Sequence, residues 1–224
     1  MPPTRREKQH AITREEIKQI AWEQMRQQGT AAISLRGIAR EMGLTAPAIY
    51  RYFPSRDDII TALLMDAYTQ FGDAMEAAAQ QPAPSIYEQI VTIGLAYREW
   101  AVNNRIQYEL IFGNPIPEYA APAELTLPLA RRAFVPLISA ILEAMQMSDW
   151  QPKAHIPTLT PRLIDAMQPR WTAEGVPLEG VYLATRFWTR VHGMVTLELY
   201  DHTPPLIGDA SEFYRLEIIS LLEE

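Results

Sequence analysis

The chain of 224 residues contains no cysteine. This absence excludes disulfides, thiol nucleophiles and thiolate metal sites. No apolar run approaches the roughly 18 residues that would span a membrane, and the N-terminus lacks the apolar core of a signal peptide. We therefore expect a cytoplasmic protein that makes no contact with a membrane.

The sequence also lacks the common short motifs of enzymes. It has no Gly-rich phosphate loop, no H-E-x-x-H and no G-x-S-x-G. Its four histidines are scattered, and only Glu198 and His202 share a helix face at a spacing of four. Because no further ligands are identifiable from spacing, we expect no metal, no cofactor and no catalysis.

Charge is unevenly distributed along the chain. The net charge is −7, which argues against a general polyanion binder. However, residues 1–60 carry a balance of +3 and residues 61–224 a balance of −10. A basic head on an acidic body favours nucleic-acid binding at the N-terminal end only.

Helical spacing dominates the sequence, and no period-2 strand pattern appears, so we predict an all-α fold. Residues 1–10 have no apolar periodicity and are expected to form a mobile basic arm. Such an arm either follows DNA phosphates and the minor groove or remains a solvated tail. Thr13 and Glu16 form a capping box that would begin the first helix, which would end near Gly29.

Residues 34–53, SLRGIAREMGLTAPAIYRYF, read as two short helices joined by a tight turn. Ser34 would cap the first helix, and Gly43 would supply the left-handed residue that follows it. Thr45 would cap the second helix, with Pro47 in its first turn.

The second of these helices, over residues 45–53, would bury Ile49 and Phe53. Its other face would then display small, aromatic and cationic side chains, which is typical of a major-groove reader. An ordinary helical hairpin that binds nothing has similar spacing.

The run GIAREMGLTAPAIYRYFPSRDDIITALL resembles the DNA-binding domain of TetR-family transcriptional regulators. The resemblance implies an N-terminal helix-turn-helix domain of three helices at 1–65 and a larger helical domain for ligand binding and dimerisation at 66–224. It implies operator DNA as the partner. The expected DNA-binding residues are Ser34, the phosphate contacts Thr45, Tyr50, Tyr52 and Arg56, and Arg36, Ala46, Pro47 and Arg51 at base edges.

Helices in the rest of the chain are expected at 56–80, 86–103, 105–112, 129–147, 178–200 and 210–222. The proline-rich stretch 148–176 leaves room for one helix near 163–167, and it could cover the mouth of a cavity. Arg190 lies beside an apolar face, so its charge needs a partner, and Glu198 is one candidate.

The segments YREWAVNNRIQYELIFG and FWTRVHGMVTLELYDH resemble the TetR subgroup whose C-terminal domain is named WHG. This resemblance implies a homodimer in which the last two helices pair with their copies in a four-helix bundle. A core within one chain would give similar stripes. The expected interface residues are Leu183, Val191, Val195, Leu199, Phe213 and Leu216.

The resemblance also implies an apolar cavity for an unidentified small-molecule effector, with Arg98 or His192 available for one acceptor or anionic group. Such aromatic stripes are more often core than cavity lining. The candidate ligand-binding residues are Tyr97, Trp100, Tyr108, Phe112, Met145, Phe187, Trp188 and His192.

Together these features predict a repressor that a small apolar ligand releases from a pseudo-palindromic operator. Two alternatives stay open at this point. One is a small-molecule binding protein without specific DNA affinity. The other, less favoured, is an α-helical enzyme that uses the body cavity.

Overall fold

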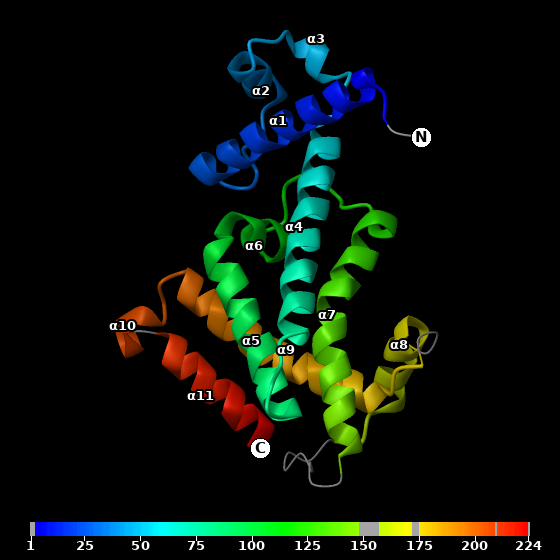
Figure 1. Cartoon of the computed structure of the whole chain (residues 1–224), viewed down its shortest axis with the longest axis vertical. Helices are drawn as coiled ribbons and strands as arrows, with labels where there is room; N and C mark the ends of the chain where they lie inside the picture. The colour runs from blue at the N-terminus through cyan, green and yellow to red at the C-terminus, as the bar shows by residue number, and fades with distance from the viewer. Residues whose placement is uncertain (1–2, 148–156, 172–174, 209, 224) are drawn as a thin grey trace. The chain divides into compact units, whose positions relative to one another are not determined.

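The computed structural model of the chain describes residues 3–147, 157–171, 175–208 and 210–223. Within these ranges every regular element is a helix, which confirms the predicted all-α fold (Figure 1). The helices are α1 (Arg5–Gln28), α2 (Leu35–Glu41), α3 (Ala46–Ile49), α4 (Arg56–Ala79), α5 (Ile86–Asn103), α6 (Arg105–Phe112), α7 (Ala123–Gln146), α8 (Pro161–Trp171), α9 (Leu178–Leu199), α10 (Pro204–Ile207) and α11 (Ala210–Glu223).

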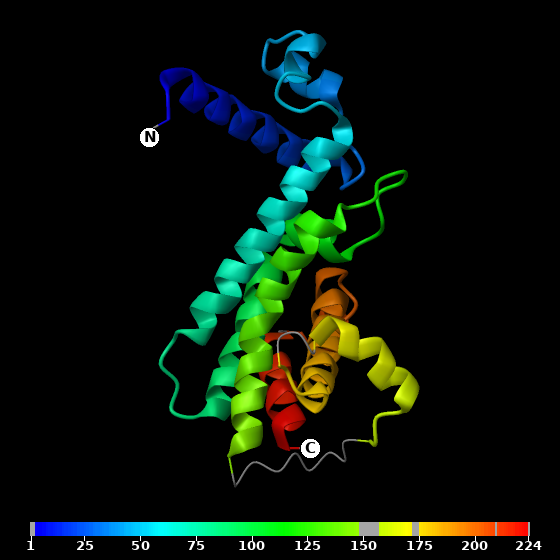
Figure 2. The same ribbon diagram turned by 90° about the vertical axis from the view of Figure 1, so that its right-hand side faces the viewer.

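The chain forms two compact units that are not continuous in sequence. The first joins residues up to Gln70 with Asn104–Ala130, and the second joins Phe71–Asn103 with the residues from Arg131 onward. Helices α4 and α7 therefore contribute to both units, and Figures 1 and 2 show α4 as one unbroken helix. The first unit includes α6 and the loop after it, beyond the continuous segment 1–65 that we expected to form a domain.

Helix α1 begins nine residues earlier than predicted, because its N-cap is Thr4 and not Thr13. Glu7 N donates to Thr4 Oγ1 at 3.3 Å, and Thr4 N donates to Glu7 Oε2 at 2.7 Å, which completes a capping box. The expected mobile arm is therefore wrong for residues 5–10, while Met1 and Pro2 lie outside the described residues. The chain has two T-x-x-E pairs in succession, and good helix formers between them let the first one begin the helix.

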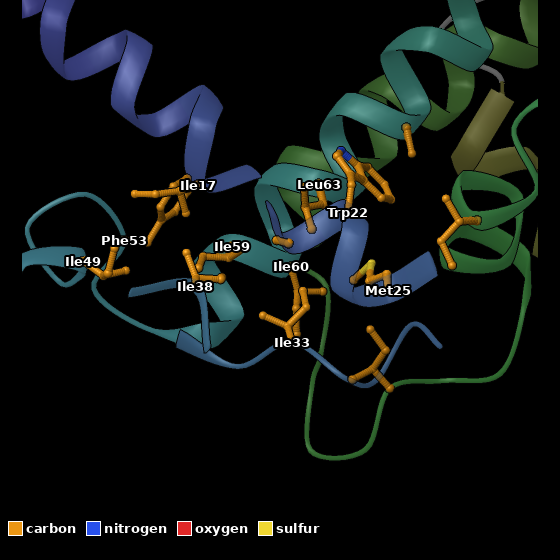
Figure 3. Packing of buried hydrophobic residues seen from close by; sticks show 14 of the residues in the cluster. Ile17, Trp22, Met25, Ile33, Ile38, Ile49, Phe53, Ile59, Ile60 and Leu63 are labelled. Carbon is orange, nitrogen blue, oxygen red and sulfur yellow. The ribbon is translucent and has the colours of Figure 1, made fainter. Parts of the chain in front are cut away.

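The core of the first unit is built almost entirely from aliphatic side chains (Figure 3). Each fully buried aliphatic side chain contributes about 1.5–3 kcal/mol relative to its exposed state. Helix α6 and the loop after it complete this core through Ile106 and Ile116. The labelled side chains in Figure 3 come from α1, the loop before α2, α2, α3, the residues after α3, and α4: Ile17, Trp22, Met25, Ile33, Ile38, Ile49, Phe53, Ile59, Ile60 and Leu63.

In the second unit, α5, α9 and α11 pack against one another. Tyr214 Oη on α11 donates to Gly94 O on α5 at 3.2 Å. Arg190 Nη2 on α9 pairs with Glu217 Oε2 on α11 at 2.6 Å. Arg190 therefore pairs with an acid of its own chain, as expected, and of the candidates it is Glu217 that binds it, while the Glu198 carboxylate is bound by another arginine, described below.

Helix α7 begins at Ala123, six residues before the predicted start, although Pro128 and Pro136 lie within it. Contrary to our expectation, it is long and apolar enough to cross a membrane, with a mean hydropathy of 1.5 over its most apolar window. However, its apolar residues from Ala133 to Ala144 are largely buried in the fold, and Arg132 pairs with Glu76 and Asp73 of α4. These contacts identify α7 as a core helix.

The proline-rich stretch 148–176 contains α8, which is longer than the helix predicted near 163–167 and has Pro169 inside it. Residues 148–156 and 172–174 of the stretch lie outside the described residues.

Candidate nucleic-acid interface and ligand cavity

Hydrogen bonds cap both ends of α2 and close the turn that leads to α3. Ser34 Oγ accepts from Gly37 N at 3.1 Å and caps α2 as predicted. At the other end, Leu44 N donates to Ala39 O at 2.8 Å and Gly43 N donates to Arg40 O at 3.2 Å. Gly43 has a φ of 65°, so this is the predicted glycine stop in the form of a Schellman motif.

The α-helical part of α3 is shorter than predicted, covering Ala46–Ile49 alone. The chain continues in turns, in which Tyr52 N and Phe53 N both donate to Ile49 O. Ile49 and Phe53 are buried as expected. Thr45 stands at the N-cap, but its side chain makes no capping hydrogen bond, and it is exposed.

The predicted DNA-binding residues divide into an exposed and a partly buried group. Ala46, Tyr52 and Arg56 are partly buried. Arg36 and Arg51 form no ion pair with any residue in the described ranges, so their charges are available on the surface. The exposed group comprises Ser34, Arg36, Thr45, Pro47, Tyr50 and Arg51.

The guanidinium of Arg56 binds backbone carbonyls, although we expected it to contact phosphates. Its Nη2 donates to Ala31 O at 2.8 Å, and its Nε donates to Ile33 O at 3.3 Å. These bonds tie the start of α4 to the loop between α1 and α2. In this structure Arg56 therefore stabilises the loop that leads into α2.

Sequence reasoning missed two residues of α1 that brace the end of α3. The guanidinium of Arg14 lies 3.9 Å from the centroid of the Phe53 ring and donates to Tyr52 O. The His10 ring lies 4.8 Å from the Tyr52 ring. Their spacing of four residues would have placed them on one helix face, but the first helix was expected to start after His10.

Hydrogen bonds and an ion pair fix α1 against α2 and α4. Gln24 accepts from Ser34 N at 3.0 Å and donates to Glu41 at 3.2 Å. Lys18 Nζ lies 2.7 Å from Asp66 Oδ2 on α4. Burial alone would lower the pKa of Lys18, but its hydrogen bonds to Asp66 and Glu15 outweigh burial, so its pKa is raised and it stays charged.

The second unit holds a small apolar cavity. Three of the predicted ligand-binding residues line it, namely Tyr97, Phe187 and Trp188. About 20 Å³ is open to the centre of a water-sized sphere, which is room for about one water. Any larger ligand must therefore displace side chains. The other lining residues are Phe71, Met75, Ile93, Gly94, Ala133, Phe134, Leu137 and Val191.

One polar pair lies at the edge of this cavity. Tyr97 Oη and His192 Nδ1 share a hydrogen bond of 2.6 Å, and the His192 ring lies 4.8 Å from the Trp188 ring. Burial lowers the pKa of His192 below its ordinary value of 6.5, so the imidazole is neutral at pH 7. The pair can therefore exchange hydrogen bonds with a neutral polar group.

The remaining predicted ligand-binding residues lie away from the cavity wall. Trp100 is 5% exposed and packs behind it, with its ring centroid 4.6 Å from that of Phe71. Tyr108 and Phe112 belong to the first unit, where their rings lie 5.2 Å apart. Met145 approaches Gly180 between α7 and α9. Trp100 and Tyr108 are core residues in this structure, and Phe112 and Met145 are partly buried.

The predicted dimer residues also divide by exposure. Phe213 and Leu216 are 38% and 56% exposed. The other four are at most 8% exposed within one chain and so have little surface to add to a contact between copies: Leu183, Val191, Val195 and Leu199. Their stripe on α9 forms the core of the second unit.

The described ranges contain no group of three or more acidic or histidine side chains that would suit a metal ion. The Glu198 carboxylate, half of the pair noted in the sequence, is bound by Arg98.

Comparison with known proteins matches the two parts of the chain separately. The family described as bacterial regulatory proteins, tetR family, matches residues 19–63. The family described as tetracyclin repressor-like, C-terminal domain, matches residues 90–221.

Curated relatives include the HTH-type transcriptional regulators Rv1816 of Mycobacterium tuberculosis and Mb1846 of Mycobacterium bovis. Each is 36% identical over 134 residues, which is 59% of this chain and 57% of the relative. The match thus spans little more than half the length of these relatives.

Solved structures share the fold over nearly the whole chain. A regulatory protein, SCO4313, is 31% identical, with a TM-score of 0.81 over 99% of this chain and 100% of that one. The TetR-family regulator PfmR of Thermus thermophilus is 16% identical, with a TM-score of 0.58 over 92% and 96%, and shows the fold alone. The C-terminal family covers more than half of the chain, and we conclude that the chain belongs to the TetR family of transcriptional regulators.

Proposed function

We propose that the chain is a repressor that binds a pseudo-palindromic operator as a homodimer and leaves it when a neutral apolar effector enters the second unit. The observation that carries the DNA-binding part is the closed turn between α2 and α3. It holds Thr45, Pro47, Tyr50 and Arg51 exposed while Ile49 anchors the same short helix in the core. Exposed side chains on a rigid support are what base and phosphate contacts require.

We assign the dimer contact to exposed apolar side chains at the end of α9 and on α11. Leu197, Tyr200, Phe213 and Leu216 are each between 38% and 56% exposed. Two copies related by a two-fold axis would bury these side chains against each other. Each half-site then takes one copy of α3, with centres about 35 Å or more apart.

The effector is assigned to the cavity beside Tyr97 and His192. The lining residues are apolar apart from Tyr97, and none of them is charged. Arg98, which we had expected to be available for an anionic group, is bound by Glu198 instead. A neutral molecule that is largely aromatic or aliphatic, with one hydrogen-bonding group, therefore suits the site. RolR, which shares only the fold, was crystallised with resorcinol.

Repression follows from operator binding when the operator overlaps a promoter, and operators often lie near the regulator's own gene. An effector that binds one state of the dimer more tightly lowers operator affinity by the ratio of its affinities for the two states. We place the protein in the cytoplasm, where DNA and metabolites are both accessible.

The test combines DNA binding with ligand screening. The chain is titrated by fluorescence anisotropy on the intergenic DNA beside its gene, and a thermal-shift screen of neutral metabolites supplies candidate effectors. At 100 times its Kd, an effector stabilises the protein by about 2.7 kcal/mol. A true effector also releases the operator.

A matched variant, Val191→Ile, adds one methyl group at the wall of the cavity, which is close to the room that the cavity offers. It should bind the operator as the wild type does and lose the response to the effector. The proposal would be contradicted if the wild-type chain showed no preference for the intergenic DNA over unrelated DNA.

A further inference from the structure

The first two turns of α1 are an exposed helical segment that buries none of its residues. Residues 5–12 are all exposed, and Thr13 is the first buried residue of the helix. The capping box of Thr4 and Glu7 and continuity with the buried part of α1 hold this segment helical. Its side chains therefore occupy defined positions, unlike those of a disordered tail.

The segment is strongly basic. Arg5, Arg6 and Lys8 stand in its first turn and a half, and the carboxylate of the one nearby acid, Glu7, accepts hydrogen bonds from Thr4. Cations in the first turn of a helix oppose its dipole, so helix stability does not explain them. No acidic side chain in the described part of the chain pairs with these three residues.

One face of this helix contacts the residues that follow α3. Arg6, His10 and Arg14 are four residues apart, so they share a helix face. On that face, His10 stacks on Tyr52 and Arg14 covers Phe53, in the stretch that follows α3. Arg6 stands one turn beyond His10, about 6 Å further along the axis. Lys8 is two residues from both Arg6 and His10 and points to the opposite side.

We propose that Arg6 binds a phosphate of the operator backbone beside the half-site that α3 reads. This inference rests on the proposed function, because it needs α3 in the major groove. The guanidinium offers a planar pair of donors that matches two phosphate oxygens. The contact adds affinity without sequence information, because a phosphate is the same beside every base.

The experiment uses the full chain and an operator selected by the wild type from random duplex DNA. Affinities of wild type, Arg6→Ala, Arg6→Lys and Lys8→Ala are measured by anisotropy between about 50 and 200 mM salt. Lys8→Ala is the matched control, because it removes the same charge from the same turns of the helix but from the other face. Circular dichroism verifies that helix content is unchanged.

For Arg6→Ala we expect the magnitude of the salt slope to fall by about two in a dimer, one for each copy, and affinity to fall about tenfold at low salt. Arg6→Lys should keep the slope, and Lys8→Ala should stay close to the wild type. Removing the base pairs outside the half-sites should weaken the wild type but leave Arg6→Ala unchanged.

Equal losses for Arg6→Ala and Lys8→Ala would overturn the inference, because a general charge effect would then explain both. Equal affinities for all four proteins would overturn it as well. If the selection yields no preferred DNA at all, the proposed function itself fails, whatever the role of Arg6.

Discussion

The guanidinium of Arg98 and the carboxylate of Glu198 face each other in a two-point ion pair. Arg98 Nε lies 2.7 Å from Glu198 Oε2, and Arg98 Nη2 lies 2.5 Å from Glu198 Oε1. The two side chains are 19% and 15% exposed, and they join α5 to α9. Such a pair adds little to stability as a whole, but removing one partner leaves a charge in a poorly solvated place.

Arg98→Leu should lower the free energy of unfolding by about 2–4 kcal/mol, because the Glu198 carboxylate would stay largely buried without its partner. The double variant Arg98→Leu, Glu198→Leu should regain most of this loss. Urea denaturation at fixed protein concentration measures the free energy of unfolding of the single and the double variant. Additive losses in the double variant would show that the two side chains are not coupled.

On the DNA side, Arg51→Ala should cost about 1–3 kcal/mol of binding at one base pair and relax specificity there, because Arg51 is expected to face a base edge. Tyr50→Phe should weaken all operators alike, because a phosphate contact carries no sequence information. Titrations on single-base operator variants separate the two patterns. A uniform loss for Arg51→Ala would remove it from the base-reading residues.

Assembly is tested by two substitutions at equally exposed leucines. Leu216 on α11 and Leu127 on α7 are both 56% exposed. Leu216→Glu should give monomers that no longer bind the operator, because it places a charge in the proposed apolar contact. Leu127→Glu should stay dimeric. Light scattering measures the mass, and a dimeric Leu216→Glu protein would move the interface elsewhere.

The half-buried His192 makes stability depend on pH. Its folded pKa is lowered by burial, so the unfolded chain binds a proton more readily. The stability that the neutral imidazole contributes is present above the unfolded pKa of about 6.5 and is lost as the pH falls toward the folded value. As the pH is lowered from about 7.5 to about 5.5, the midpoint temperature of thermal unfolding should therefore fall more steeply for the wild type than for His192→Asn. An equal fall of the midpoint in both proteins would contradict the assignment of this pH dependence to His192.

Local signals in the sequence predicted most of the helices correctly. The boundaries of α5 and α6 agree with their predicted ranges, because Ser85 and the break at Asn104 are short-range features. Helices α1 and α7 began earlier than expected. In α1 an earlier capping box competed with the later one, and α7 continues through two prolines because tertiary packing outweighs propensity.

The sequence predicted the residues of the candidate sites less well than it predicted the helices. The stripe of Val191, Val195 and Leu199 has the same spacing whether it faces its own chain or a partner, and the structure shows it facing its own chain. The tasks of the arginines were equally hidden, since Arg56 binds carbonyls 23 and 25 residues away and Arg98 binds a carboxylate 100 residues away. Charge near an apolar stripe shows that a partner is needed but not which one it is.

The most direct test of sequence-specific DNA binding is selection by the full chain from a pool of random duplex DNA. The account predicts an enriched pseudo-palindrome whose half-site centres are about one helical turn or more apart. It also predicts that Arg51→Ala enriches a motif relaxed at one position in each half-site. A pool that stays random after repeated rounds with the wild-type protein would contradict the account.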